Sequence, residues 1–311
     1  MAIQDGWEDV FRTWARPPSE TEQDRSDNAE RMIREAIRND AVLSKRNIDV
    51  FAQGSYKHNT NIKQDSDVDI CIRYMDTFFY DLPDQSVGPE RFGIEPSVYT
   101  LLEFKNAVEN ALVNKFGRKS VTRGNRAFDI HENSYRVNAD VVACFEYRLY
   151  TGSFVGGVAQ YDSGTELHPD KGGRIINWPQ QNYENGVWKN KQTGTRYKYI
   201  VRILKRLRNY MKENKVQAAN DIASFLIECL AWNVPNDSYC SDSYISNVRS
   251  VLAHLFNETL TDEKCAKWGE VNELKYLFNA CHRGGLRRSI GFHRDNCSIN
   301  FMFNCGDIFL G

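Results

Sequence analysis

The sequence lacks a long apolar run, an excess of one charge and paired cysteines, and each absence removes a class of protein. No apolar stretch approaches the ~18–20 residues of a membrane span, and residues 1–11 carry early acids without a signal-peptide core. We therefore expect a soluble, cytoplasmic protein without membrane contacts. The 40 basic residues are balanced by 41 acidic residues, which argues against a general nucleic-acid binder.

The eight cysteines are scattered along the chain, and no two of them form a Cys-x-x-Cys pair. Cys281 and His282, with His293 and Cys297, come closest to a zinc pattern, but an adjacent Cys-His pair is not a usual ligand spacing. We predict no structural zinc. Without a secretory signal, we expect most of these cysteines to be reduced and buried.

The composition is that of an ordinary globular protein, with 41% apolar and 26% charged residues in a chain of 311, long enough for one large or two ordinary domains. No internal repeat or low-complexity segment is present. The pattern predicts a mixed α/β core up to about residue 195, preceded by a helix and followed by a helical half. Hydrophobic periodicity predicts these elements: helices at 19–40, 97–116 and from 195 to the 280s, strands at 47–53 and 68–74, an antiparallel pair of strands at 120–130 and 135–150, and an irregular strand and hairpin at 172–195 with Asn185-Gly186 as its turn.

Ser19 with Glu22 predicts a capping box at the start of the first helix, and the Pro and Gly residues of 77–96 predict a long loop. On the helix at 195–212, the expected buried stripe is Ile200, Ile203, Leu204, Leu207 and Met211.

Two aspartates in alternate positions, Asp67 and Asp69, open the predicted strand at 68–74. Residues i and i+2 of a strand point the same way, so the two carboxylates should project from one face and repel unless a cation lies between them. Carboxylate oxygens suit Mg²⁺, which also binds substrate phosphates. Asp65 continues the alternation, but it precedes the strand, and we interpret it as a turn residue.

A third carboxylate, Asp140, lies within the apolar run 135–150, where burial without a partner is costly. A metal shared with Asp67 and Asp69 would be such a partner. Asp129 is the rival position, which we rank lower because its surroundings are more polar. A hydrogen-bonded structural aspartate remains the alternative.

The Gly54-Ser55 pair follows the strand 47–53, and the eleven residues 56–66 separate it from the aspartate pair. Glycine lets the backbone approach a ligand closely, and the serine hydroxyl with nearby N–H groups can hold phosphate oxygens. A phosphate beside a metal site indicates phosphoryl or nucleotidyl transfer.

These residues resemble the signature of the polymerase-β-like nucleotidyltransferases, and "QGS", "SDVDI", "ADVVA" and "YKYIVRILKRLRNYMKEN" are similar to the cGAS/DncV-like nucleotidyltransferases of bacterial anti-phage (CBASS) signalling. The resemblance spans the chain to about residue 235. It implies an α+β fold, with a nucleotidyltransferase core of mixed sheet and helices at 1–195, a helical lobe at 196–311 and the active site in the cleft between them.

The resemblance also implies roles for individual residues. Gly54 and Ser55 would bind the triphosphate, and Asp67, Asp69 and Asp140 would be catalytic ligands of Mg²⁺, with Mn²⁺ as a substitute.

Four further residues are predicted to bind nucleotide. Gln53 belongs to "QGS", and Tyr56 is a weaker pocket candidate beside the phosphate turn. Lys205 and Ser224 occupy the places of a family lysine and serine that contact the triphosphate. The residues themselves agree for Lys205, because it falls on a polar helix face that bears Lys198, Arg202, Lys205 and Asn209. A solvated basic face is the alternative interpretation.

The implied activity is condensation of NTPs (ATP or GTP, or UTP or CTP) into a cyclic di- or trinucleotide second messenger with release of pyrophosphate. We expect a monomer that does not sense double-stranded DNA directly, since no Cys/His cluster could form the zinc insertion of the animal enzyme. A regulatory protein partner is left unidentified. Two alternatives stay open: a nucleotidyltransferase that makes linear oligonucleotides or modifies an RNA, protein or small molecule, and a non-catalytic nucleotide-binding scaffold.

Overall fold

The computed structural model describes residues 2–62, 67–132 and 137–278, and these form two compact units. A helical unit comprises residues 1–18, 58–64 and 180–311, and a sheet unit comprises residues 19–57 and 65–179. Both units are therefore assembled from segments that are distant in the sequence. The first 18 residues group with the helical unit, whereas the sequence-based division placed them with the core.

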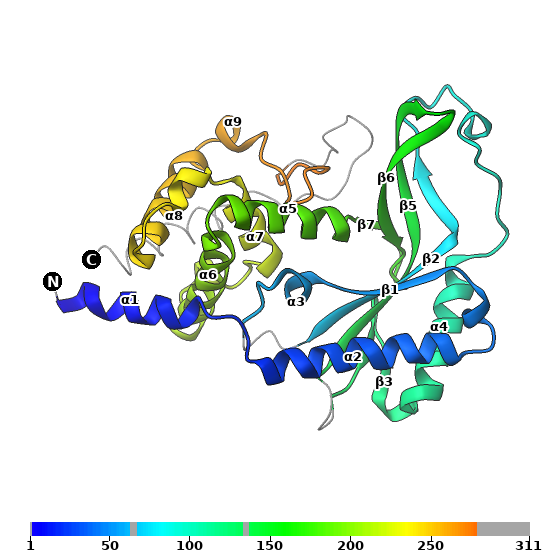
Figure 1. The fold of residues 1–311 in the computed structure, drawn as a ribbon, viewed down its shortest axis with the longest axis horizontal. Helices are drawn as coiled ribbons and strands as arrows, with labels where there is room; N and C mark the ends of the chain where they lie inside the picture. The colour runs from blue at the N-terminus through cyan, green and yellow to red at the C-terminus, as the bar shows by residue number, and fades with distance from the viewer. Residues whose placement is uncertain (1, 63–66, 133–136, 279–311) are drawn as a thin grey trace. The chain divides into compact units, whose positions relative to one another are not determined.

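The sheet unit is built on a mixed sheet in which strands neighbour one another in the order β1-β2-β5-β4-β3, while β6 pairs with β5 and β7 (Figure 1). β2 and β5 run parallel, and β1 and β4 pair antiparallel with β2 and β5, respectively. The strands are β1 (Ile48–Gln53), β2 (Val68–Asp81), β3 (Val121–Arg123), β4 (Phe128–Ile130), β5 (Ala139–Val155), β6 (Val158–Leu167) and β7 (Ile175–Asn177).

Two helices, α2 (Glu20–Asn39) and α4 (Leu101–Phe116), pack on one face of this sheet. Apolar strand residues such as Ile70, Ile72 and Val141 meet the apolar stripes of both helices in a single buried cluster. Each helix begins with a capping box, which satisfies otherwise unpaired N–H groups of the first turn. The predicted box of Ser19 with Glu22 is confirmed.

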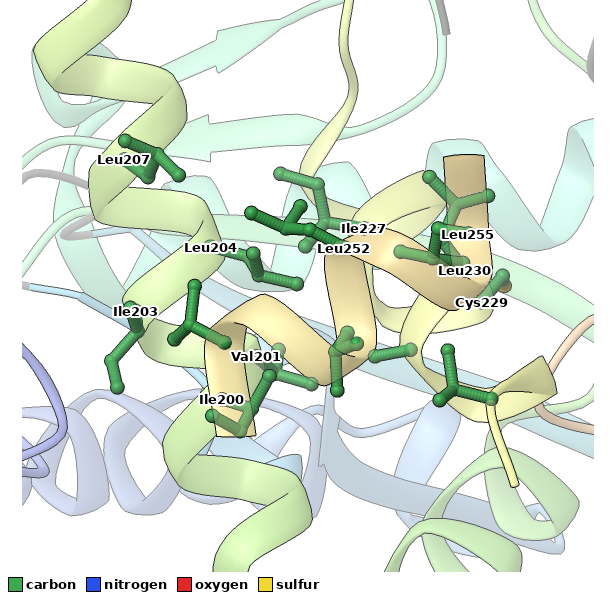
Figure 2. Close-up of a cluster of buried hydrophobic side chains, with 14 of the residues drawn as sticks. Ile200, Val201, Ile203, Leu204, Leu207, Ile227, Cys229, Leu230, Leu252 and Leu255 are labelled. Carbon is green, nitrogen blue, oxygen red and sulfur yellow. The ribbon is translucent and has the colours of Figure 1, made fainter. Parts of the chain in front are cut away.

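The helical unit contains α1 (Ala2–Trp14), α5 (Pro179–Gln192), α6 (Arg196–Glu213), α7 (Ser224–Asn233), α8 (Tyr244–Glu258) and α9 (Asp262–Cys265). Side chains of α6 such as Val201, Leu204 and Leu207 meet those of α7 and α8 in the core (Figure 2). The predicted buried stripe of α6 (Ile200, Ile203, Leu204, Leu207 and Met211) is confirmed in full. In the described part of the chain, no helix has the length and hydropathy to cross a membrane.

The irregular strand and hairpin predicted for 172–195 is wrong beyond its first residues, because α5 occupies most of this segment. Asn185-Gly186 lies inside the helix, where Asn185 Nδ2 donates to the carbonyl of Val271 at 2.8 Å and Gly186 is buried. Lys189 is also buried and donates to the carbonyls of Trp232 and Val234. Tertiary contacts therefore override the local preference of Asn-Gly for a turn.

The run at 120–130 is a hairpin of its own, β3 with β4, and β4 then pairs antiparallel with β5. The prediction of antiparallel pairing between the two runs is thus confirmed for β4 and β5. β2 continues to Asp81, well past the predicted end at residue 74, and takes up the start of the expected loop at 77–96.

Candidate active site

Three aspartates and one glutamine form a row across four neighbouring strands of the sheet unit. Gln53 of β1 is in register with Asp69 of β2, Asp69 with Asp140 of β5, and Asp140 with Asp129 of β4. Partners in register lie side by side on the same face of a sheet. The predicted pairing of Asp69 with a carboxylate some seventy residues later is therefore present, and Asp129 joins it.

Asp67 is exposed and lies one residue before β2 begins, so it precedes the strand and does not belong to it. It nevertheless acts on Asp140. Burial raises the pKa of Asp140 to about 6, and the negative charges of Asp129 and Asp67 and a hydrogen bond with Asp129 add to the shift. Within the described part of the chain, the charges that shift the pKa of Asp140 are therefore negative.

Gly54 directly follows β1 and opens the short helix α3 (Gly54–His58) with a φ of +64°. A Cβ at this position would overlap Oδ2 of Asp69. Both the left-handed backbone and the close approach to the carboxylate therefore require glycine. The Gly-Ser turn of the sequence is in fact a strand-to-helix junction packed against the aspartate row.

Replacing Gly54 with alanine is expected to abolish the nucleotidyl transfer that the resemblance implies, because the added methyl group displaces the Asp69 carboxylate. Gly156→Ala is the matched control, since Gly156 also has a positive φ of +58° but an added Cβ meets nothing within 4 Å. Backbone strain alone, about 1–2 kcal/mol, would lower the unfolding free energy of both variants. Product formation and urea unfolding measure the two effects, and equal activity of the two variants would contradict the assignment.

The other predicted residues of this segment have different environments. Ser55 and Gln53 are half-buried near the row, whereas Tyr56 is buried in the apolar cluster beneath the sheet. Asp65, which continues the alternation of Asp67 and Asp69, lies outside the described residues. The same holds for the residues that come closest to a zinc pattern, Cys281, His282, His293 and Cys297.

In the helical unit, Lys205 of α6 is fully buried and its Nζ donates to Glu228 Oε1 of α7 at 2.7 Å. His58 Nδ1 lies 3.2 Å from the other oxygen of Glu228, and the Thr60 hydroxyl donates to Oε1 at 2.7 Å. Burial alone would raise the pKa of Glu228, but the charge of Lys205, with the hydrogen bond and charge of His58, holds it well below its ordinary value. Glu228 is therefore a buried carboxylate with several partners.

Two residues of the basic face predicted for this helix, Arg202 and Lys205, are buried, whereas Lys198 and Asn209 are partly exposed. Arg202 is buried and donates to the carbonyls of Ala15 and Asn59, at 2.7 and 2.5 Å. Ser224 opens α7 and its Oγ accepts a bond from Arg208 Nη1 at 3.0 Å. Much of the basic charge on α6 thus holds other segments of the helical unit in place.

Sequence reasoning missed Glu228 and did not foresee that Asp129 would lie beside Asp140. Glu228 had a signal of the same kind as Asp140, since it is the lone acid of the apolar run "FLIECLAW". Asp129 had none, because its position depends on a strand pairing that only the fold defines.

The chemistry of the aspartate row fits a divalent cation. Hard carboxylate oxygens are what Mg²⁺ binds, and a cation would offset the negative charges of Asp129 and Asp67, which add to the effect of burial on the pKa of Asp140. Among the described side chains, no three of the His, Cys, Asp and Glu type are already gathered closely enough to hold a metal ion.

Several known proteins resemble this chain over most of its length. Residues 184–288 match the model of the cGAS/DncV-like nucleotidyltransferase C-terminal helical domain. The chain is 46% identical to the cyclic dipyrimidine nucleotide synthase CdnE of Legionella pneumophila and 43% identical to that of Cecembia lonarensis, covering 88% of this chain in both cases and 91% and 90% of the relatives.

A solved structure of Rhodothermus marinus CdnE, a c-UMP-AMP synthase with Apcpp and Upnpp, has a TM-score of 0.82 and 28% identity, and the match covers 98% of this chain and 96% of that one. The relatives match across both units, and the sheet unit carries the expected carboxylates. The chain therefore belongs to the cGAS/DncV-like nucleotidyltransferases, and like the relatives named above it is a cyclic nucleotide synthase.

Proposed function

We propose that the chain condenses two pyrimidine ribonucleoside triphosphates, UTP or CTP, into a cyclic dinucleotide that acts as a second messenger in anti-phage signalling. One observation carries the choice of base: both relatives above 40% identity are named cyclic dipyrimidine nucleotide synthases. A hybrid product from UTP and ATP is the second candidate, because the Rhodothermus marinus structure is that of a c-UMP-AMP synthase.

In each of the two steps, a ribose hydroxyl attacks an α-phosphorus, a new P–O bond forms, and the bond to pyrophosphate breaks. We assign Asp140 to accept the hydroxyl proton, because its pKa of about 6 is nearer neutrality than that of an ordinary aspartate. The Gly54 backbone and Ser55 hydroxyl hold the triphosphate, and the tight junction at Gly54 supports this role.

Asp67, Asp69 and Asp140 would hold Mg²⁺, which supplies positive charge to the phosphate oxygens when bound. Asp129 lies next to Asp140 in register, and its charge and hydrogen bond contribute to that high pKa. We also propose that Gln53, Tyr56, Lys205 and Ser224 bind nucleotide. Lys205 already has Glu228 as partner, so a triphosphate would have to share its ammonium.

The test is product identification. The protein is incubated with Mg²⁺ and each labelled NTP alone and in pairs, and products that survive phosphatase are identified by mass. We expect a resistant cyclic product from UTP, CTP or both, and none from the Asp67→Ala/Asp69→Ala variant.

A resistant product that requires ATP with UTP would favour the hybrid candidate. Products made only from purines would reject the choice of base. Phosphatase-sensitive products alone would reject ring closure, and product from the double variant would reject the site.

A further inference from the structure

A cavity of about 790 Å³ lies in the sheet unit, well away from the aspartate row. It is bordered by residues 76–80 of β2 and by the chain that leads into α4. Asp76 is seven residues beyond Asp69 on the same strand, about 20 Å away at the rise of a β-strand. The cavity is therefore separate from the proposed chemistry.

Aromatic rings line the inner part of the cavity. The rings of Phe79 and His168 are 4.9 Å apart between centroids, and Phe79 also contacts Phe145. The volume is within the range of about 300–1,000 Å³ typical of ligand sites, and apolar walls with few polar groups are usual for them. The interior suits apolar side chains.

One wall of the cavity is an open strand edge. β1 pairs with β2 only as far as Tyr74, and the Met75 amide donates to the Asn47 carbonyl at 2.9 Å. Beyond that point, no strand among the described residues pairs with this side of β2, although its other side pairs with β5 as far as Asp81. An open edge with room beside it is a template for an added strand.

The rim of the cavity is acidic. The lining carboxylates are Asp76, Glu90 and Glu95, and the exposed Glu90 and Glu95 form no ion pair within the described chain. His168 alone among the lining residues can carry positive charge, and its Nε2 is already 2.8 Å from Glu166 Oε1. Arg46 lies over the ring of Tyr99 at 5.5 Å but is not among the lining residues, so the lining itself is complementary to a basic partner.

Apolar surface continues beyond the rim. Val98 is 96% exposed and Leu102, which lines the cavity, is 59% exposed. A small molecule confined to the cavity would leave the strand edge and this surface unused. An extended segment of another protein would cover all of them.

We propose that this groove, formed by residues 76–80, 89–90 and 94–102, binds an extended segment of a partner protein that adds as a strand to the open edge of β2. Alternate apolar side chains of that segment enter the aromatic cavity, and its basic residues pair with Glu90 and Glu95. Strand addition supplies affinity through backbone hydrogen bonds, and the pocket supplies specificity.

The test selects a phage-displayed library of random linear octapeptides against the full chain, with Glu90→Lys/Glu95→Lys for counter-selection. We expect peptides that alternate apolar and basic residues. Binding of the consensus peptide should weaken about tenfold or more in each of two protein variants, Glu90→Lys/Glu95→Lys and Leu102→Glu. N-methylation of alternate amides in the peptide should weaken it by a similar factor, because it removes backbone hydrogen bonds to β2. Val42→Glu is the matched control, because Val42 is 55% exposed but does not line the groove.

Three results would overturn the proposal: no enrichment over the counter-selection, unchanged binding of the N-methylated peptide, or a dimer in sedimentation that Leu102→Glu dissociates, which would assign the groove to a second copy. Nucleotide condensation is measured separately for every variant and should persist. Peptide binding can therefore be disproved while the proposed nucleotide condensation is confirmed. Condensation can likewise be disproved while peptide binding is confirmed.

Discussion

Replacing Asp140 with asparagine is expected to abolish nucleotide condensation and at the same time to stabilise the metal-free protein. Loss of a positioned proton acceptor lowers rates by about 10²–10⁴-fold, and the proposed metal site loses a ligand as well. The gain in stability follows from the pKa of Asp140, which burial and then the charges of Asp129 and Asp67 raise to about 6.

The sign of the pH dependence follows from that shift. The folded protein holds the Asp140 proton more tightly than the unfolded chain, whose aspartates ionise near pH 3.9. Asp140 therefore costs no stability below pH 4, and its ionisation destabilises the folded protein as pH rises towards 6 and beyond. Since Asp140 is only partly buried, we expect this loss to be about 1 kcal/mol at pH 7 after allowance for solvent screening, and the asparagine variant should not suffer it.

Urea unfolding at pH 5 and pH 7 in EDTA, with a pyrophosphate-release assay, measures both effects. Asp162→Asn is the control, because burial also raises the pKa of Asp162 in β6, outside the row. We expect it to gain stability and keep its activity. An active Asp140→Asn protein, or one less stable than wild type at pH 7 without metal, would contradict the prediction.

Replacing Lys205 with methionine is expected to lower the unfolding free energy of the helical unit by about 3–5 kcal/mol, because it leaves Glu228 as a buried and poorly compensated carboxylate. The double variant Lys205→Met/Glu228→Gln should recover most of that loss, since no buried charge remains. The exposed Lys212 of α6 provides the control Lys212→Met, which should have little effect.

Tryptophan fluorescence during urea unfolding reports on this unit, because every tryptophan except Trp178 lies in it. The partners of Glu228 lower its pKa, so the stability they confer is present above the ordinary glutamate pKa and declines as pH falls below it. The double variant should lose this acid sensitivity. If Lys205→Met alone were as stable as wild type, the ion pair between Lys205 and Glu228 would not contribute to stability, and the prediction would be wrong.

The double variant also tests the proposed role of Lys205 towards the triphosphate. If it folds and its KM for NTP is unchanged, Lys205 acts only within the protein. A raised KM in a folded double variant would support contact with the nucleotide.

The sequence revealed what depends on local chemistry. Ser19 and Glu22 predicted the start of α2, and the apolar stripe of α6 predicted its buried face. Asp140 could be singled out because an acid in an apolar strand needs a partner. Its register with Asp69 could not be derived from either strand alone.

What the sequence did not reveal depends on contacts made at a distance. The burial of Lys205 and Arg202 follows from segments near residues 15 and 59–60 that accept their hydrogen bonds. The continuation of β2 beyond Tyr74 follows from its pairing with β5 as far as Asp81, a contact that neither strand specifies alone. α5 continues through Asn185-Gly186 because of a distant contact as well, the hydrogen bond from Asn185 to the carbonyl of Val271.

The composition of the helical unit from three stretches of chain constrains the order in which the protein can fold. During synthesis, residues 1–18 and 58–64 leave the ribosome before α6 and α7 have been made. His58, Thr60 and the Ala15 carbonyl therefore cannot form their bonds until Glu228 and Arg202 have been synthesised. A fragment that begins at residue 180 lacks all three, and Glu228 and Arg202 would be left with fewer partners. The helical unit therefore cannot be obtained by simple truncation, and any shortened version must carry both early segments.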